Sequence, residues 1–435
     1  MKRTGWTVAA AVAVGAMFVV LSGCGSNSGG LPPSSGGTGG GGSSTGANVT
    51  AITVGPGPQG SNYANTPFVT VRVCVPGSTS ACQNIPDVLL DTGSYGLRLL
   101  SSVVNIALPE TQNSSGNTLA ECTEFEDSYA WGSVATADVY MGGSSNEGEA
   151  ATGVPIQLIA PSGFPAAPSD CTQSGLTATN TVQTLGANGV LGVGPFTDDC
   201  GPACDPGSTD APSPEPYYYC AGSDCTPTPL AESGQVQNPV WMFANDNNGI
   251  IVQLGAISAG GAASATGSLI FGLGTESNNS LGTATVLTVD DYGNISTTYN
   301  GVTYSDSGPS NYAGSFFDTG SNGLFVLDSA TLGQGMADCA ASGSAPGFYC
   351  PSSPINYTAT NAGTNGNTKA AAFTIANAET LLGVTTDFAY DDLGGAFGSS
   401  TEAFDWGLPF FFGRTVYIAI DGEDTPAGTG PYFAY

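Results

Sequence analysis

From about residue 50 onward, hydrophobic positions occur in short runs separated by glycine, asparagine, aspartate, serine and proline. The runs are rich in β-branched and aromatic residues, which is typical of strands. The clearest runs, each expected to be a strand, are 68–74, 88–90, 137–141, 269–271 and 415–420. Helical periodicity is brief, as over residues 370–382. The pattern therefore predicts an all-β protein.

One part of this pattern occurs twice. Residues 88–100 read Val-Leu-Leu-Asp-Thr-Gly-Ser-Tyr-Gly-Leu-Arg-Leu-Leu, and residues 315–327 read Ser-Phe-Phe-Asp-Thr-Gly-Ser-Asn-Gly-Leu-Phe-Val-Leu. In each copy an apolar run leads into Asp-Thr-Gly-Ser, and Gly-Leu then begins a second apolar run. The copies lie about half the chain apart, which predicts two similar lobes and not a solenoid.

The repeat supplies two carboxyl groups, Asp91 and Asp318. If the two loops meet across a pseudo-twofold axis, the carboxyls face each other and share a proton, because two such close charges do not both ionise easily. The ionised member can take a proton from water while the protonated member polarises a peptide carbonyl. A single Asp-Thr-Gly-Ser is also a common turn in a chain rich in glycine and serine. The second copy favours chemistry.

Charge and composition exclude other classes of function. The chain has 6 basic and 35 acidic residues and no histidine, for a net charge of −29. Mechanisms that use Ser-His-Asp or Cys-His are excluded, and we expect no metal site and no cofactor. Nucleic acid is not expected as a partner, because phosphate binding needs Lys and Arg. Repulsion among carboxylates predicts a fold that is more stable in mild acid, with simple acidic solubility as the alternative.

The N-terminus has the pattern of an export signal. Lys2 and Arg3 precede an apolar run at 8–21, too short to span a membrane comfortably, so residues 1–23 are expected to be a signal peptide. The ending Leu-Ser-Gly-Cys resembles the bacterial lipobox, which implies lipidation of Cys24; a plain signal peptide or a membrane helix are the alternatives. Residues 24–49 form the lipidated cysteine and a flexible Gly/Ser linker. We expect an exported protein, anchored by lipid to the bacterial outer membrane on its periplasmic or cell-surface side.

Ten of the 11 cysteines remain besides Cys24, and this even number in an exported chain predicts up to five disulfides. The pairs expected from spacing are Cys74–Cys82 and Cys339–Cys350, with Cys122–Cys171 by elimination. Four more lie in an insertion rich in proline and aspartate, and their pairing stays open: Cys200, Cys204, Cys220 and Cys225. A four-cysteine metal site is the alternative for this cluster.

The two motifs and their surroundings resemble the pepsin family of aspartic peptidases over most of residues 55–425. The resemblance implies an all-β, bilobal fold with pseudo-twofold symmetry and a central cleft, with lobes at 50–265 and 266–435. It implies that Asp91 and Asp318 are catalytic. It also implies that the motif threonines lock the two loops together and that the serines bond the catalytic carboxyls. These supporting residues are Thr92, Gly93, Ser94, Thr319, Gly320 and Ser321.

Further landmarks extend the resemblance. The run Tyr-Ala-Trp-Gly-Ser is similar to the family's flap, a hairpin that covers the cleft and contacts substrate. The flap residues expected from it are Tyr129, Trp131, Gly132 and Ser133. A strand ending in two apolar residues and glycine supports each loop in the family; residues 188–192 fit this well and 405–407 loosely. Arg98 stands where the family often has tryptophan, and we expect it near the cleft, where it can hold Asp91 ionised.

The leading hypothesis is an aspartic endopeptidase of the cell envelope that cleaves peptides with apolar residues around the scissile bond. The alternative is a catalytically weak or inactive pepsin-fold lipoprotein with a peptide-binding or structural role, similar to an uncharacterised bacterial lipoprotein group that carries Gly-Leu-Pro-Phe-Phe-Phe-Gly-Arg, here 407–414. An unrelated all-β surface protein, such as a carbohydrate binder, is a third possibility. The expected partners are a peptide or protein substrate and the membrane, through the lipid anchor, with the protein itself a monomer.

Overall fold

The structure is a computed structural model that describes residues 46–58, 61–172, 176–209, 212, 215–305, 314–397 and 403–435. The predicted signal peptide, Cys24 and nearly all of the predicted linker lie outside the described residues. Among the helices of the described ranges, none is long and apolar enough to cross a membrane.

Strands dominate the described chain, which confirms the predicted all-β class. The largest sheet contains β1 (Val49–Val54), β2 (Pro67–Cys74), β3 (Cys82–Asp91), β4 (Tyr95–Leu100), β5 (Thr118–Glu124), β6 (Ser128–Met141), β7 (Glu149–Ile159), β8 (Thr177–Ala178), β9 (Gly189–Val193), β10 (Tyr217–Ala221), β11 (Asp224–Pro227), β12 (Gly249–Leu254), β13 (Ala265–Phe271), β14 (Val286–Thr288), β23 (Thr415–Ala419) and β26 (Tyr432–Ala434). Smaller sheets contain β15 (Ser296–Tyr299), β16 (Val302–Tyr304), β19 (Ile355–Ala362) and β20 (Thr368–Ile375); β17 (Phe316–Asp318), β18 (Leu324–Val326), β21 (Gly394–Ala396) and β22 (Asp405–Gly407); and β24 (Asp424–Thr425) with β25 (Gly428–Thr429). The helices are α1 (Val182–Leu185), α2 (Ser329–Leu332), α3 (Ala378–Leu382) and α4 (Leu408–Phe411), with 3-10 turns at Ser101–Val103, Gly201–Cys204, Glu232–Gly234 and Pro239–Met242.

The five runs predicted as strands fall in β2, β3, β6, β13 and β23, except that Ile420 follows the end of β23. The helical periodicity assigned to 370–382 is wrong over most of its length, because β20 extends to Ile375 and only α3 is helical. Within β20 every second side chain, at Ala371, Phe373 and Ile375, is buried, and the strand pairs with β19 along its full length. Burial of alternate residues in this hairpin outweighs the helix propensity of its alanines.

Two four-strand units repeat the same pairing pattern. In the first, β3 is parallel to β9, β9 is antiparallel to β4, and β4 is parallel to β7. In the second, β17 is parallel to β22, β22 is antiparallel to β18, and β18 is parallel to β21. Each Asp-Thr-Gly-Ser motif follows the first strand of its unit, β3 or β17. This repetition confirms the predicted bilobal architecture with pseudo-twofold symmetry.

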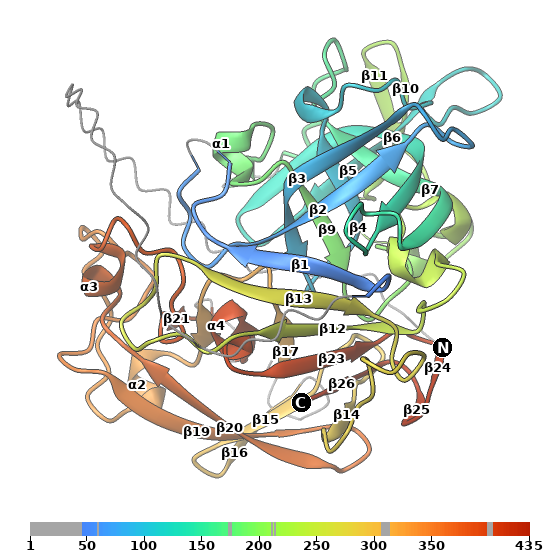
Figure 1. The fold of residues 1–435 in the computed structure, drawn as a ribbon. Coiled ribbons are helices and arrows are strands. Elements are labelled where there is room, and N and C mark those ends of the chain that lie inside the picture. Colours follow the sequence, from blue (N-terminus) through green and yellow to red (C-terminus); the bar gives the residue numbers. More distant parts are fainter. Residues whose placement is uncertain are drawn as a thin grey trace, which may run out of the picture.

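A shared sheet joins the two lobes. Its strand order is β1–β13–β12–β23–β26–β14, so strands from the two ends of the chain lie beside strands from its middle. Figure 1 shows β2, β3, β6 and β7 on one side of these strands and β15, β16, β19 and β20 on the other. The predicted limit between 265 and 266 falls at the start of β13, inside the shared sheet. The lobe ranges 50–265 and 266–435 therefore stay a prediction.

Five disulfides link all ten cysteines after Cys24. The three expected pairs are confirmed, and the pairing left open for the insertion is resolved into two short loops and not a metal site. The pairs are Cys74–Cys82, Cys122–Cys171, Cys200–Cys204, Cys220–Cys225 and Cys339–Cys350. Four of the five join cysteines that are 11 residues or fewer apart, so they fix local hairpins and turns.

An aromatic cluster packs against Phe317, the residue that precedes the second Asp-Thr-Gly-Ser motif. The ring of Phe317, in β17, lies 5.0 Å from those of Phe410 and Phe433 and 5.5 Å from that of Tyr435. Phe410 brings the Gly-Leu-Pro-Phe-Phe run into this cluster, because α4 follows β22 directly and all of its side chains are buried. The backbone N–H of Leu408 also donates to the Ser321 carbonyl, at 2.8 Å.

Candidate active site

Each motif aspartate ends a strand whose parallel neighbour carries a glycine at the same level. Asp91 lies opposite Gly192, and Asp318 lies opposite Gly407. A Cβ atom on Gly192 would be 2.5 Å from the Tyr95 backbone nitrogen, and one on Gly407 would overlap the Gly323 carbonyl oxygen. Only glycine leaves room for the loop that follows each aspartate, which explains why the supporting strand carries a glycine opposite the aspartate in both lobes.

The two carboxyls have matching hydrogen bonds. The N–H of Gly93 donates to Asp91 Oδ1 at 2.8 Å, and the Ser94 hydroxyl donates to Oδ2 at 2.5 Å. In the second loop, the N–H of Gly320 donates to Asp318 Oδ1 at 2.7 Å, and the Ser321 hydroxyl donates to Oδ2 at 2.8 Å. Both carboxyls are therefore held by their own loops, which fixes their orientation.

The two threonines interlock the loops across the lobes. The N–H of Thr92 donates to Thr319 Oγ1 at 3.1 Å, and the N–H of Thr319 donates to Thr92 Oγ1 at 3.0 Å. Each hydroxyl then donates to a carbonyl in the strand before the opposite loop: Thr92 to Phe317 at 2.9 Å and Thr319 to Leu90 at 2.6 Å. These four buried bonds bring Asp91 and Asp318 together.

The carboxyls face each other at close range. Asp91 and Asp318 are both fully buried and within hydrogen-bonding reach of each other. A Cβ atom on Gly93 would lie 2.6 Å from Asp318 Cγ, and one on Gly320 would lie 2.7 Å from Asp91 Oδ1. Burial, then the charge of Asp91, then that of Asp405, raises the pKa of Asp318 well above its ordinary value. The pair therefore tends to retain one proton.

Adding one methyl group at Gly320 should misplace the pair. The methyl group that Gly320→Ala introduces would overlap the Asp91 carboxyl, and a displacement of about 1 Å can cost roughly 10²-fold in rate. We expect a comparable loss in the kcat of any hydrolysis. Gly255→Ala is the matched control, since its Cβ atom would meet nothing closer than 3.7 Å. Equal rates in the two variants would contradict the close approach of the loops.

The flap residues expected from sequence all lie in β6, but not at its turn. The β5–β6 hairpin turns at residues 125–127, and Tyr129 pairs with Glu124 just beyond the turn. The charge of Glu126, at this turn, is the smallest of the contributions that raise the pKa of Asp405, after burial and the charge of Asp91. Tyr129 is half-buried, and its carbonyl accepts from the N–H and the hydroxyl of Thr179, each at 2.9 Å.

The other three residues predicted for the flap occupy buried packing positions in β6. The indole N–H of Trp131 donates to the Pro165 carbonyl at 2.8 Å, and its ring lies 5.3 Å from that of Tyr218. Gly132 and Ser133 are buried in mid-strand. A Cβ atom at Gly132 would overlap the Leu158 carbonyl oxygen, so this glycine is required by the contact of β6 with β7.

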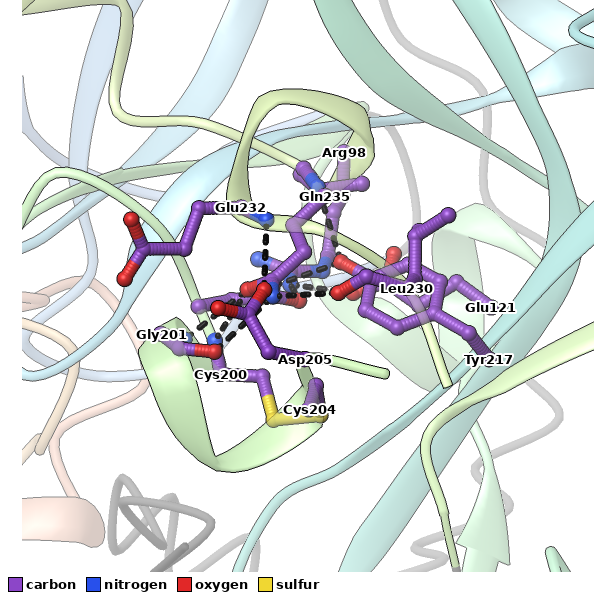
Figure 2. The surroundings of a disulfide bond; sticks show 12 residues. Arg98, Glu121, Cys200, Gly201, Cys204, Asp205, Tyr217, Leu230, Glu232 and Gln235 are labelled. Carbon is purple, nitrogen blue, oxygen red and sulfur yellow. Dashed lines mark hydrogen bonds and ion pairs between the residues drawn. A yellow bond between two sulfur atoms is a disulfide. The ribbon is translucent and has the colours of Figure 1, made fainter. Parts of the chain in front are cut away.

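Arg98 belongs to a buried ionic network in the first lobe. Its Nη2 lies 2.5 Å from Glu121 Oε1 and 2.8 Å from Asp199 Oδ2, and its Nε donates to Thr123 at 2.8 Å. The Tyr217 hydroxyl donates to Asp199 at 2.6 Å. Figure 2 shows Arg98, Glu121 and Tyr217 gathered near the Cys200–Cys204 disulfide.

This network corrects the role expected for Arg98. Arg98 forms its ion pairs with Glu121 and Asp199. The hydrogen bonds to the Asp91 carboxyl come from its own loop. Arg98 offers one positive charge to two carboxylates. Burial, then the charge of Glu121, accordingly raises the pKa of Asp199 well above its ordinary value although Arg98 opposes this. The residue at this position therefore stabilises the lobe and does not tune the aspartate pair.

Several buried acids predict that stability falls as the pH rises. Burial raises the pKa of Asp392 to about 6 and that of Glu149 to about 7, and the pKa values of Asp318 and Asp199 are raised as well. The folded chain therefore binds protons more tightly than the unfolded chain, whose carboxyls titrate near pH 4. The contribution of these groups to the free energy of unfolding is fully present below about pH 4. It is lost as the pH rises through the pKa values that the groups have in the folded chain.

We expect a melting temperature at pH 5 that is higher than at pH 7.5 by at least about 5 °C. One pKa unit corresponds to about 1.4 kcal/mol, and 1 kcal/mol moves the melting temperature of a lobe-sized domain by about 2–4 °C. Scanning calorimetry in matched ionic strength measures this shift. A melting temperature that is equal or higher at pH 7.5 would contradict it.

Among the described residues, no group of three or more His, Cys, Asp or Glu side chains could hold a metal ion.

A family model described as "Protein of unknown function (DUF3443)" matches residues 44–435. No curated protein matches the chain. Among solved structures, the chain is similar to an aspartic proteinase from Irpex lacteus, with 15% identity and a TM-score of 0.46 over 89% of this chain and 96% of that chain.

Proposed function

The chain belongs to this family of unknown function (DUF3443), and we propose that it is an aspartic endopeptidase that hydrolyses peptide bonds with water activated between Asp91 and Asp318. The observation that carries the proposal is the interlocked pair: two buried carboxyls, held by matching loops within reach of each other, with the pKa of Asp318 raised. Burying two acids that face each other costs stability. A purely structural role of the two turns therefore does not account for the acids.

In the proposed reaction each aspartate transfers a proton twice, once while the gem-diol forms and once while it breaks down. Ionised Asp91 takes a proton from a water molecule, and the resulting hydroxide adds to the carbonyl carbon of the peptide bond. Protonated Asp318 gives its proton to the carbonyl oxygen, so a neutral gem-diol forms. Asp91 then returns its proton to the leaving nitrogen while Asp318 takes one from the gem-diol, and the C–N bond breaks. The pair ends in its starting state, without a covalent intermediate.

The loop bonds orient both carboxyls for these roles, since Asp91 and Asp318 each accept from an N–H and a hydroxyl. The proposed starting state places the proton on Asp318 because the pKa of that carboxyl is raised. Tyr129 is proposed to contact the substrate, because it lies beside the tip of the β5–β6 hairpin. Tyr129 is the flap residue to test, because the other three are buried in packing positions: Trp131, Gly132 and Ser133.

The proposed place of action is the bacterial cell envelope. Five disulfides support an oxidising, exported environment. Lipidation of Cys24 and anchoring to the outer membrane rest on the sequence pattern, and so do the signal peptide at 1–23 and the monomeric state. The proposed hydrolysis can be tested apart from the anchor, because both motifs lie far beyond Cys24 along the chain.

The test is digestion of an unfolded, disulfide-free protein between pH 2 and 7 by the purified chain with its disulfides intact. We expect internal cleavage in acid, inhibited by pepstatin, which acts on pepsin-like enzymes. Cleavage that pepstatin does not affect would contradict the proposal. Pepstatin or peptide binding without cleavage would support the alternative, a peptide-binding envelope lipoprotein of low or no activity.

A further inference from the structure

Asp405 is a third buried acid beside the pair. It lies in β22, between Phe316 of β17 and Phe325 of β18. Its side chain is fully buried, and neither carboxyl oxygen has a hydrogen-bond partner among the described residues. An ionised carboxylate in such a place is very costly, whereas a neutral carboxyl costs much less. The surroundings therefore favour the protonated form of Asp405.

The first lobe shows that this strand position does not need an acid. Asp405 stands two residues before Gly407, the partner of Asp318, and Val190 stands two residues before Gly192, the partner of Asp91. Val190 is buried like Asp405, so the same pairing pattern accepts an apolar side chain. The two four-strand units therefore differ at this position, and the acid occurs only in the unit that carries Asp318.

Ser321 connects Asp405 to Asp318. The Ser321 hydroxyl interacts with the Asp405 carboxyl, but its single proton is donated to Asp318 Oδ2 at 2.8 Å. This explains why Asp405 interacts with Ser321 and still accepts no hydrogen bond of its own. A hydroxyl oxygen can also accept a bond. A protonated Asp405 can fill that position with its own O–H, which satisfies a donor that otherwise has no partner.

The charges that face Asp405 also favour its neutral form. They come from Asp91 in β3, Asp318 in β17 and Glu126 at the tip of the β5–β6 hairpin, and all three are acidic. Among the described residues, no basic side chain contributes to its titration. Burial, only partly offset by Ser321, raises the pKa of Asp405 well above its ordinary value.

We propose that Asp405 is a positioning residue of the aspartate pair: its neutral carboxyl donates to Ser321 and so commits the Ser321 proton to Asp318. The proposal rests on the proposed function for its effect on catalysis, but not for its effect on titration. When Asp405 loses its proton at higher pH, its new charge disfavours ionisation of Asp318. The pair then keeps its shared proton to a higher pH than it would without Asp405.

The first test measures stability, and it does not depend on activity. Asp405→Asn keeps a donor for Ser321 but cannot ionise, and Asp405→Val copies the first lobe. Because the folded pKa of Asp405 is raised, its burial weakens the fold increasingly as the pH rises above about 4. We expect the melting temperature of Asp405→Asn, relative to wild type, to rise by several degrees between pH 4 and pH 7.5. Asp224→Asn, at an exposed position, is the control and should show no such rise.

The result that would overturn the proposal is a difference in melting temperature between Asp405→Asn and wild type that is the same at both pH values. That outcome would mean that Asp405 does not titrate differently in the folded chain. If Asp405→Val does not fold, the asparagine variant still decides this point. If the wild-type chain cleaves nothing, the stability result still tests Asp405, so failure of the proposed function and failure of this inference are distinguishable.

The second test uses the active enzyme. In Asp405→Asn the alkaline limb of the kcat profile should move to lower pH by at least about half a unit. The asparagine cannot acquire the negative charge that Asp405 gains as the pH rises, and that charge disfavours ionisation of Asp318. Asp405→Val should lose more kcat than Asp405→Asn, because valine cannot donate to Ser321. An unmoved alkaline limb, or equal kcat in the two variants, would contradict the positioning role.

Discussion

Replacing Arg98 with methionine is expected to lower the free energy of unfolding by about 3–5 kcal/mol at pH 7.5, the range seen when one partner of a buried ion pair is removed. Arg98 and Glu121 are almost wholly inaccessible to solvent, with side chains 1% and 0% exposed. Methionine fills much of the same volume, so the loss comes mainly from Glu121 and Asp199, which are left without a counter-charge. Urea unfolding with intact disulfides measures the change.

The chain offers a matched control for this prediction in Arg72, which pairs with Glu147 at 2.8 Å. Their side chains are 23% and 51% exposed, so water screens the pair. Arg72→Met should cost less than about 1 kcal/mol. Equal losses in the two variants would show that the buried network does not stabilise the first lobe. The folded fraction of Arg98→Met should also keep the wild-type pH profile, because Arg98 does not hold Asp91.

The second large effect is expected from Asp91→Asn, which should lower kcat by at least about 10³-fold. An amide cannot take a proton from water, and general-base catalysis contributes about 10²–10⁴-fold. Loss of the fold is not the expected cause, since removing one of two facing acids relieves repulsion at neutral pH. Its melting temperature at pH 7.5 should therefore equal or exceed that of wild type.

Asp318→Asn is the companion variant, because it removes the protonated member of the pair. It should be inactive as well, and Asp224→Asn, an exposed substitution of the same kind, should keep full activity. A folded Asp91→Asn variant with wild-type kcat would show that the observed hydrolysis arises elsewhere. The melting curve of each variant separates that outcome from simple unfolding.

The features that the sequence predicted correctly are local or repeated. Short β-branched runs form strands, and the cysteines flanking short loops pair across them. The repeat about Asp91 and Asp318 predicted two related lobes because each copy carries its strand and loop together. Such features need no knowledge of which distant segments meet, so pattern and spacing are sufficient to find them.

The position of a turn that carries no sequence signal could not be predicted. The β5–β6 hairpin turns at Phe-Glu-Asp, which has neither glycine nor proline, so the sequence predicted a flap hairpin without locating its turn. Spacing from the first motif located the hairpin but not its tip. Gly132 is there for close contact between two strands, a reason that is visible only once β6 and β7 are paired.

Contacts between distant residues could not be predicted either. The partners of Arg98 lie 23 and 101 residues away along the chain. Asp405 did leave a signal, a carboxylate in an otherwise apolar strand next to Trp406, but the sequence alone does not show that this strand lies against the second motif. Comparison with the equivalent position in the first lobe, Val190, required the register of both units.

The most direct test of the central claim is to digest an unfolded protein in oxygen-18 water and to map the new termini by mass spectrometry. A water-activating pair predicts internal peptide fragments from the wild-type chain in mild acid, each new carboxyl terminus carrying one labelled oxygen, and none from Asp91→Asn. Absence of cleavage anywhere between pH 2 and 7, from a folded chain with intact disulfides, would contradict the assignment of Asp91 and Asp318 as a hydrolytic pair.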